Sequence, residues 1–179
     1  MNTNTVPLDN CSGYGLFNLL KDKENLLGLE IGCYLGDTTN FLLKNIQTLK
    51  LYGIDPYETY IDWNGNTINR NSDTYVRFIE KVKHFEDRFK LFRKTSDEAV
   101  KDFEDGLFDF IFVDGLHTYD QVKTDIENYY PKLKTGGLFS GHDYNSILEV
   151  KKAVDEFALT SKITNIQFTD FDVWYWYKV

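Results

Sequence analysis

Short apolar runs of four to six residues recur along this chain, and stretches in which apolar residues have a helical period separate them. This alternation is typical of a parallel sheet covered by helices, and it argues against a sandwich or a helical bundle. The clearest run is Phe108–Val113, which is almost unbroken apolar, as expected of a central parallel strand that is buried on both faces. We therefore predict an α/β fold: a Rossmann-like, doubly wound, mostly parallel sheet with helices on both faces and a C-terminal antiparallel strand pair.

The periodicity also places the individual elements. Residues 56–71 are polar, rich in Asn and aromatic residues, and too irregular for either period, so we expect a long loop there that could serve as a lid. Gly136-Gly137 should turn the chain into the fifth strand. Strands are expected at residues 27–34, 51–55, 90–94, 108–113 and 138–141, with the antiparallel pair at 163–168 and 173–179. Helices are expected at residues 15–27, from 37 onward, and at 72–85, 97–103, 119–130 and 147–159.

Composition bounds the number of domains and the kinds of partner. The 179 residues carry a net charge of −8, and we expect one domain over residues 1–179 that opens with a helical segment at residues 1–27. So acidic a surface repels phosphate backbones, and no long apolar run or leader pattern occurs, so we expect no nucleic acid or membrane partner and a cytoplasmic location. Cys11 and Cys33 are isolated thiols, which suit a reducing compartment and exclude a disulfide scaffold.

A glycine loop follows the first predicted strand. Gly32 lets the backbone approach a ligand without a Cβ clash, and Gly36 permits close packing where the next helix starts. A dinucleotide site would have a second glycine two residues after Gly32, where this chain has Tyr34. The sequence therefore argues against a nicotinamide dinucleotide as the ligand. The structural alternative is a plain turn between a strand and a helix.

The ends of the second and third strands add polar groups. Asp55 ends the second strand, where a doubly wound fold places an acid that binds both ribose hydroxyls of a nucleoside; a turn-forming Asp before a proline is the alternative. Ser96 follows the third strand and could contact an adenine. Thr95 and Glu98 also match a helix capping box, and at this position we favour that structural role.

A second group of polar residues follows the fourth and fifth strands. Asp114 and Asp143 would project side by side if these parallel strands are neighbours, and two carboxylates there could share one divalent cation. His142 could be a further ligand. His117 lies three residues beyond Asp114 and is our candidate general base, because an imidazole can take a proton near neutrality.

Aromatic residues are concentrated in two regions. Trp174 and Trp176 should share one face of the last strand, and we expect them to pack in the core or at the interface of a homodimer. The aromatic residues at the predicted lid could stack on a sugar or aromatic acceptor, or pack the loop onto the sheet; they are Tyr57, Tyr60, Trp63 and Tyr75.

Six motifs, in chain order, are familiar: Glu-Ile-Gly-Cys-Tyr-Leu-Gly, Gly-Ile-Asp-Pro, Phe-Ile-Phe-Val-Asp-Gly-Leu-His-Thr-Tyr, Lys-Thr-Gly-Gly, Gly-His-Asp-Tyr and Val-Lys-Lys-Ala-Val-Asp-Glu-Phe. From Gly28 to about Phe157 the chain resembles the class I S-adenosylmethionine-dependent methyltransferases. Within that class it is most similar to methyltransferase family 24, small-molecule O-methyltransferases related to enzymes that modify sugars of macrolides and cell-surface glycans.

The resemblance implies roles for particular residues. Asp55 would bind the ribose of S-adenosylmethionine, and Ser96 would lie near its adenine. Asp114 would hold Mg²⁺, and His117 would act as the base. The fifth-strand pair is often Glu-Asp in such enzymes and is His142-Asp143 here, and an imidazole is a poorer Mg²⁺ ligand than a carboxylate. The cofactor-binding residues so expected are Glu30, Gly32, Cys33, Tyr34, Gly36, Asp55 and Ser96.

We therefore expect an S-adenosylmethionine-dependent O-methyltransferase that acts on a hydroxyl group of a small molecule, for example a sugar. The expected catalytic residues are His117 and Asp114, and the expected cation ligands are Asp114, His142 and Asp143. Two alternatives are a nicotinamide-dependent oxidoreductase and a non-catalytic module that binds S-adenosylmethionine.

Overall fold

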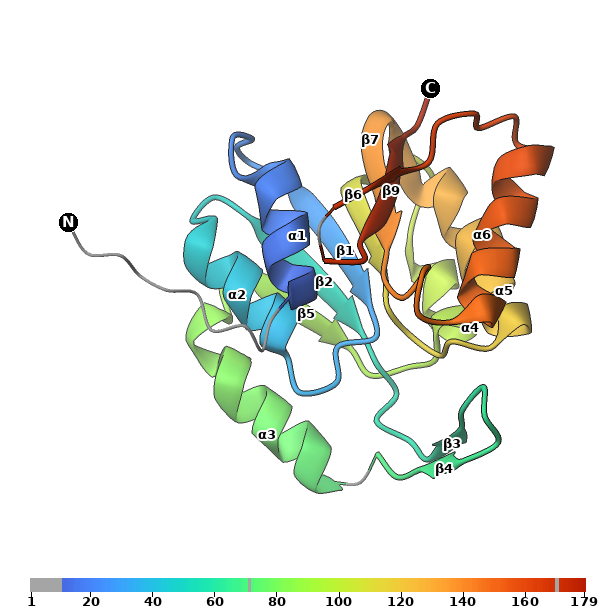
Figure 1. Cartoon of the computed structure of the whole chain (residues 1–179). Helices are drawn as coiled ribbons and strands as arrows, with labels where there is room; N and C mark the ends of the chain where they lie inside the picture. Colours follow the sequence, from blue (N-terminus) through green and yellow to red (C-terminus); the bar gives the residue numbers. More distant parts are fainter. Residues whose placement is uncertain (1–10, 71, 170) are drawn as a thin grey trace.

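A seven-stranded sheet forms the centre of the structure, a computed structural model that describes residues 11–70, 72–169 and 171–179 (Figure 1). The strand order is β5-β2-β1-β6-β7-β9-β8, in which the first five strands are parallel and β9 is antiparallel to both neighbours. The predicted fold class and C-terminal antiparallel pair are confirmed. The strands are β1 (Leu27–Ile31), β2 (Lys50–Ile54), β5 (Phe89–Phe92), β6 (Phe108–Val113), β7 (Leu133–Gly141), β8 (Gln167–Phe168) and β9 (Trp174–Tyr177).

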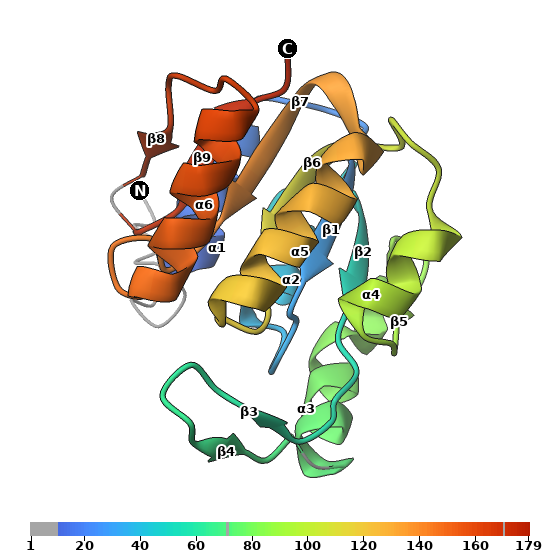
Figure 2. The same ribbon diagram turned by 90° about the vertical axis from the view of Figure 1, so that its right-hand side faces the viewer.

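Helices cover both faces of the sheet (Figures 1 and 2). The α-helices are α1 (Cys11–Leu20), α2 (Asp37–Asn45), α3 (Ser72–Val82), α4 (Ser96–Ala99), α5 (Tyr119–Tyr129) and α6 (Leu148–Thr160). Short 3₁₀ turns, η1 (Lys83–Phe85), η2 (Val100–Asp102) and η3 (Tyr130–Lys132), extend α3, α4 and α5. The predicted N-terminal helix is shorter than expected and ends at Leu20, and the first ten residues of the predicted segment 1–27 lie outside the described residues.

The central strand β6 divides the core into two layers. Its successive side chains point to opposite faces. Phe110 and Phe112 pack with α1 and α2, whereas Ile111 packs with α5 and α6. All three side chains are fully buried. The apolar run that predicted this strand is therefore explained by burial on both faces.

The last strand completes the second layer. Trp174 and Trp176 lie on its buried face with stacked rings whose centroids are 5.1 Å apart. Both belong to the main core cluster, which confirms the predicted core packing.

Two predicted segments differ in the structure. Strand β7 already begins at Leu133 and runs through Gly136-Gly137, which we had predicted as a turn before the strand. The pairing with β6 shifts register between Phe108 and Phe110, and Gly136 has a φ of +79°, so the glycines accommodate an irregularity within the strand.

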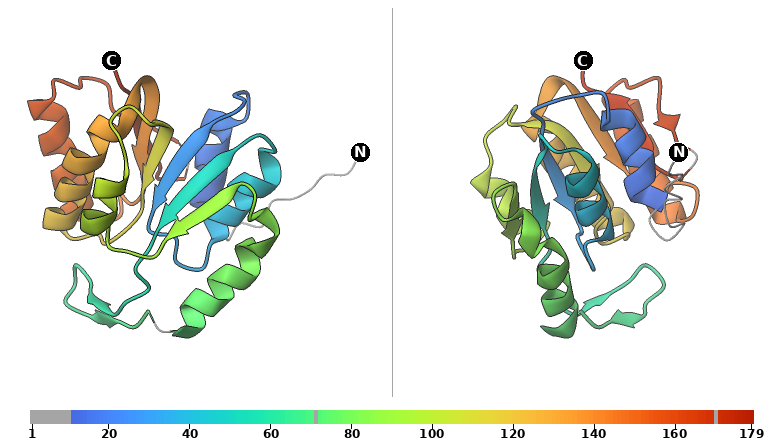
Figure 3. Two further views of the ribbon diagram at one scale, coloured as in Figure 1. Left: turned by 180° about the vertical axis from the view of Figure 1, so that it is seen from behind. Right: turned by 90° about the vertical axis from the view of Figure 1, so that its left-hand side faces the viewer.

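The second difference concerns the predicted loop at residues 56–71. It contains a short antiparallel hairpin, β3 (Tyr60–Ile61) and β4 (Thr67–Ile68), which we call the β3–β4 hairpin. The Asp62 carboxylate accepts hydrogen bonds from the backbone N–H groups of Asn64 and Asn66 and so fixes the turn. The hairpin lies beyond the edge of the sheet at which the parallel strands end (Figures 2 and 3).

No helix in the described part of the chain is both long and apolar enough to cross a membrane.

Candidate active site

The glycine loop after β1 is held against the ends of two neighbouring strands. The Gly32 N–H donates to the carbonyl of Ile54 at the end of β2, and the Asp114 N–H after β6 donates to the carbonyl of Ile31. Gly32 has a φ of +90°, and a Cβ at this position would lie 2.1 Å from the backbone oxygen of Asp114. Only glycine therefore permits this approach between the loop and the end of β6.

Asp55 fixes the conformation of the glycine loop. One carboxylate oxygen accepts hydrogen bonds from the backbone N–H groups of Cys33 and Tyr34, at 3.1 and 2.9 Å. The other oxygen accepts from the N–H of Tyr57 at 2.8 Å. The acid predicted for the ribose thus has a structural role at the same strand end, and its ribose contact stays a prediction.

Glu30 and Cys33 lie beneath the loop. Burial raises the pKa of Glu30 to about 8, although a hydrogen bond from the Thr39 hydroxyl, at 2.5 Å, lowers it. Burial also raises the pKa of the Cys33 thiol well above its ordinary value. The side chains of Glu30 and Cys33 are 2% and 4% exposed, so any contribution that they make to a ligand site acts through the shape of the loop.

A cavity of about 230 Å³ opens beside the glycine loop and the ends of β1, β2, β5 and β6. It is the kind of concave site at the carboxyl edge of an α/β sheet at which ligands bind. Five predicted site residues line it, and they are Gly32, Tyr34, Asp55, Ser96 and Asp114. Glu30, Cys33 and Gly36 are not among the lining residues.

A hydrogen-bonded polar cluster also lines the cavity. The side-chain amide of Gln121, on α5, donates to the Ser96 hydroxyl at 3.2 Å and to Asp125 at 3.0 Å. The favoured capping box at Thr95 and Glu98 is present, with both reciprocal hydrogen bonds. Burial raises the pKa of Asp125 to about 7, although the hydrogen bonds from Ser96 and Gln121 lower it.

The raised pKa of Asp125 predicts a pH dependence of stability. The unfolded carboxyl loses its proton near its ordinary pKa of 3.8, whereas the folded carboxyl keeps it up to about pH 7. The folded state then binds more protons between these values, so this group makes the free energy of unfolding fall as pH rises through that window. In Asp125→Asn this contribution is absent. We therefore expect the melting temperature of the variant, relative to wild type, to rise by several degrees between about pH 4.5 and pH 7.5.

Thermal melts of the ligand-free protein at several pH values measure this difference. Asp22→Asn, at an exposed position, is the control, and its difference from wild type should stay constant. A pH-independent difference for Asp125→Asn would show that the buried carboxyl is ionised throughout.

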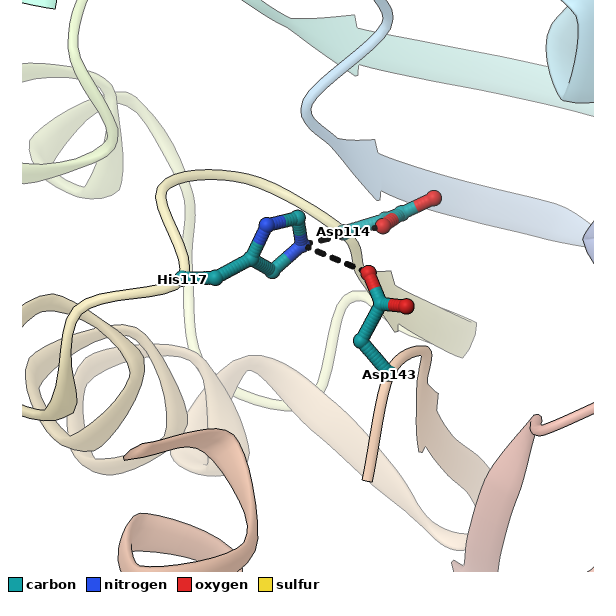
Figure 4. A group of neighbouring side chains, drawn as sticks. All are labelled: Asp114, His117 and Asp143. Atoms are coloured by element: carbon teal, nitrogen blue, oxygen red, sulfur yellow. Dashed lines mark hydrogen bonds and ion pairs between the residues drawn. The ribbon is translucent and has the colours of Figure 1, made fainter. Parts of the chain in front are cut away.

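The second predicted group does gather at the sheet edge. The His117 Nε2 atom lies 3.3 Å from Asp114 Oδ1 and 3.3 Å from Asp143 Oδ2, so the imidazole faces both carboxylates (Figure 4). The ligand atoms of these three residues all lie within 4.8 Å of one another, and each side chain is about one fifth exposed. Two carboxylate oxygens and one imidazole nitrogen can bind a divalent cation, or the carboxylates can orient the imidazole as a base.

His142 lies beside this group and contacts its carboxylates, with the Nδ1 atom 3.9 Å from Asp114 Oδ1. Its Nε2 atom is 3.1 Å from the carbonyl oxygen of Phe171, and its Nδ1 atom is 3.3 Å from Asp143 Oδ1. Burial lowers the pKa of His142, but the hydrogen bond to Asp143 and the negative charges of Asp114 and Asp143 outweigh burial and raise it to about 9. With both ring nitrogens as donors, His142 is a charged partner of Asp143. The imidazole among the grouped cation-binding atoms is that of His117, whereas our predicted set has His142.

The four aromatic residues expected at or beside the predicted lid have different surroundings in the structure. Tyr57 is buried, and its ring packs against Tyr75 and Phe78, with centroids 5.3 and 5.5 Å away. Trp63 is 38% exposed, and its ring meets that of His117 edge to face at 5.4 Å. Tyr60 lines the cavity. Packing of the loop thus accounts for Tyr57 and Tyr75, whereas Tyr60 and Trp63 face the candidate site.

Sequence reasoning did not single out several polar cavity residues, among them Gln121, Asp125 and Arg70. Gln121 and Asp125 are one helical turn apart on α5, which follows Asp114 in the chain. This spacing puts both side chains on one face of the helix and could have indicated that they lie at the same site. Arg70 lines the cavity from the segment after the hairpin, where no periodicity marks it.

Comparisons with known proteins show the family of this chain. The model of a family described as "Methyltransferase domain", methyltransferase family 24, matches residues 29–144. Protein R132 of Acanthamoeba polyphaga mimivirus, described as uncharacterized, is 29% identical over 126 residues, which are 69% of this chain and 53% of that protein. The uncharacterized protein y4gI of Sinorhizobium fredii is 46% identical over 73 residues, 41% of this chain and 7% of that protein. The match thus spans about half the length of protein R132 and a small part of protein y4gI.

Solved structures share the fold at low sequence identity. The O-methyltransferase NovP has a TM-score of 0.68 and 14% identity, and the match covers 93% of this chain and 77% of that one. A methyltransferase from Geobacter sulfurreducens has a TM-score of 0.65 and 16% identity, with 96% and 80% covered.

Proposed function

The chain belongs to methyltransferase family 24, a family of methyltransferase domains, and from this membership and its site we propose that it transfers a methyl group from S-adenosylmethionine to a hydroxyl group of a small molecule, for example a sugar. One observation carries the proposal: Asp114 both lines the cavity and contacts the imidazole of His117. Asp114 would therefore contact both a cofactor bound in the cavity and the base beside it. O-methyltransferases among the structural neighbours favour oxygen as the acceptor atom.

The cavity residues fit the cofactor by their chemistry. The Asp55 carboxylate can accept hydrogen bonds from ribose hydroxyls, and Ser96 offers a hydroxyl where an adenine would lie. Several carboxylates line the cavity, which suits a ligand that bears a sulfonium and an ammonium group. When bound, S-adenosylmethionine supplies an activated methyl group and a good leaving group.

His117 then removes the proton from the acceptor hydroxyl. Two carboxylates face Nε2 and hold the ring hydrogen there, so Nδ1 is the nitrogen that accepts the proton. The resulting imidazolium is stabilised between Asp114 and Asp143, because two opposite charges lie within hydrogen-bonding reach of its Nε2–H group. A divalent cation bound by the same three side chains would be the alternative to this base, because it would occupy the His117 Nε2 lone pair and leave the ring proton on Nδ1; it would instead lower the pKa of the acceptor hydroxyl.

Binding of S-adenosylhomocysteine tests the cofactor directly. A ligand that binds only the native state stabilises it, by about 2.7 kcal/mol at a hundredfold excess over Kd. For a chain of this length we expect the melting temperature to rise by roughly 5–10 °C. NADH, in the same thermal-shift titration, should leave the melting temperature unchanged because Tyr34 stands where a dinucleotide site needs glycine.

The outcomes separate the candidate functions. Stabilisation by NADH and not by S-adenosylhomocysteine would replace the proposal with the oxidoreductase alternative. Stabilisation by S-adenosylhomocysteine without methyl transfer to any member of a sugar and phenol panel would favour the non-catalytic module. The same titration with Mg²⁺ tests the cation: stabilisation of the wild type and not of Asp143→Asn would assign it to the Asp114, His117 and Asp143 group.

A further inference from the structure

Acidic side chains outnumber basic ones around the cavity. Five carboxylate side chains line it, those of Asp55, Glu58, Asp97, Asp114 and Asp125. Among its described lining residues, Arg70 alone is basic. In a chain with a net charge of −8, a single guanidinium at an acidic cavity needs an explanation.

Arg70 is positioned by two aromatic residues. Its guanidinium carbon lies 3.7 Å from the centre of the Tyr34 ring, and Nη2 donates a hydrogen bond to the Tyr60 hydroxyl at 3.2 Å. Tyr34 belongs to the glycine loop, and Tyr60 belongs to the β3–β4 hairpin. The stacking contact therefore places Arg70 beside the glycine loop, at the part of the cavity that Tyr34 lines.

The guanidinium retains unused binding capacity. It carries five N–H donors, and in the described part of the chain its one hydrogen bond is with Tyr60. None of the described carboxylates forms an ion pair with it, although ten other ion pairs in the described part of the chain join basic side chains to acids at 3.3 Å or less. Free N–H donors in this fork geometry match the two oxygens of a carboxylate.

We propose that Arg70 binds the carboxylate of the amino-acid part of S-adenosylmethionine; this inference rests on the proposed function. The cofactor carries two positive groups and one carboxylate. The acidic lining suits the positive groups, and Arg70 supplies the one complementary positive charge. Arg70 is thus a binding residue that selects the aminoacyl end of the ligand and orients it toward the glycine loop.

Two ligands that differ in this carboxylate test the proposal. S-adenosylhomocysteine has the amino-acid part, whereas 5′-methylthioadenosine keeps the nucleoside and the thioether but lacks the amino-acid part. Calorimetric titration of wild type and Arg70→Gln should show that the variant binds S-adenosylhomocysteine about 10- to 100-fold more weakly, the range for a hydrogen-bonded charge pair. Its affinity for 5′-methylthioadenosine should stay within about twofold of wild type. Arg70→Lys should recover part of the loss because it restores the charge without the fork.

Arg93→Gln is the matched control. Arg93 also stacks on a tyrosine, Tyr75, at 4.4 Å, but it does not line the cavity, so both affinities should remain at the wild-type value. Equal affinity of wild type and Arg70→Gln for S-adenosylhomocysteine would overturn the inference, and so would an equal loss for both ligands, which would indicate a role in closing the hairpin. A wild-type protein that binds neither ligand would instead contradict the proposed function itself.

Discussion

Replacing His117 by alanine is expected to lower the rate of methyl transfer by about 10²- to 10⁴-fold, the usual contribution of a general base. The affinity for S-adenosylhomocysteine should change little, because His117 is not among the residues that line the cavity. The reason for the loss of rate is geometric: Asp114 and Asp143 both lie 3.3 Å from the His117 Nε2 atom and fix its imidazole, whereas both ring nitrogens of His142 are already within hydrogen-bonding distance of oxygen atoms of Phe171 and Asp143.

The measurement is the release of S-adenosylhomocysteine with an acceptor found in a panel of sugars and phenols. His84→Ala is the control, since His84 is an exposed histidine on η1 that does not line the cavity, and its loss should leave turnover unchanged. If His117→Ala turns over at the wild-type rate, His117 is not the general base. Lost turnover together with lost cofactor binding would indicate instead that the imidazole holds the loop in place.

The sequence predicts which side chains lie close together where those side chains follow strand ends. An almost unbroken apolar run such as Phe108–Val113 predicts a strand that is buried on both faces. Parallel strands end at one edge of a sheet, so Asp114 and Asp143 approach each other because β6 and β7 are neighbours. The residues that follow such strands are therefore accessible to sequence reasoning, and the structure brings His117 to the same place.

The orientation of the two imidazoles was not accessible in this way. His142 follows β7 directly, but its ring is hydrogen-bonded to the carbonyl oxygen of Phe171, which is 29 residues away in sequence. That partner lies in the connection before β9, and no local pattern predicts its position. The same limit applies to Arg70, whose neighbour Tyr34 is 36 positions earlier, because stacking between loops depends on how the hairpin folds back.

Replacing Gly32 by alanine is expected to have the largest effect on stability among the changes considered. An alanine at a φ of +90° is strained by about 1–3 kcal/mol. Its Cβ would also lie 2.1 Å from the backbone oxygen of Asp114, so the loop or the end of β6 must move. We expect a total loss of at least about 3 kcal/mol in the free energy of unfolding. For a chain of this length the melting temperature should fall by at least roughly 6–12 °C.

The chain offers a matched control for the backbone strain. Gly65, in the turn of the β3–β4 hairpin, also has a positive φ, +79°, but a Cβ there would meet no atom within 4 Å. Gly65→Ala therefore carries the strain without the clash, and the difference between the two variants isolates the contact of Gly32 with Asp114. Asp114 lines the cavity and contacts His117, so its displacement in Gly32→Ala should also abolish the stabilisation by S-adenosylhomocysteine. Gly65→Ala leaves Asp114 in place and should still be stabilised by this ligand. Equal melting temperatures for the two variants would mean that the glycine loop and the end of β6 move independently. The contact between Gly32 and Asp114 would then not hold the cavity and His117 in a fixed relative position.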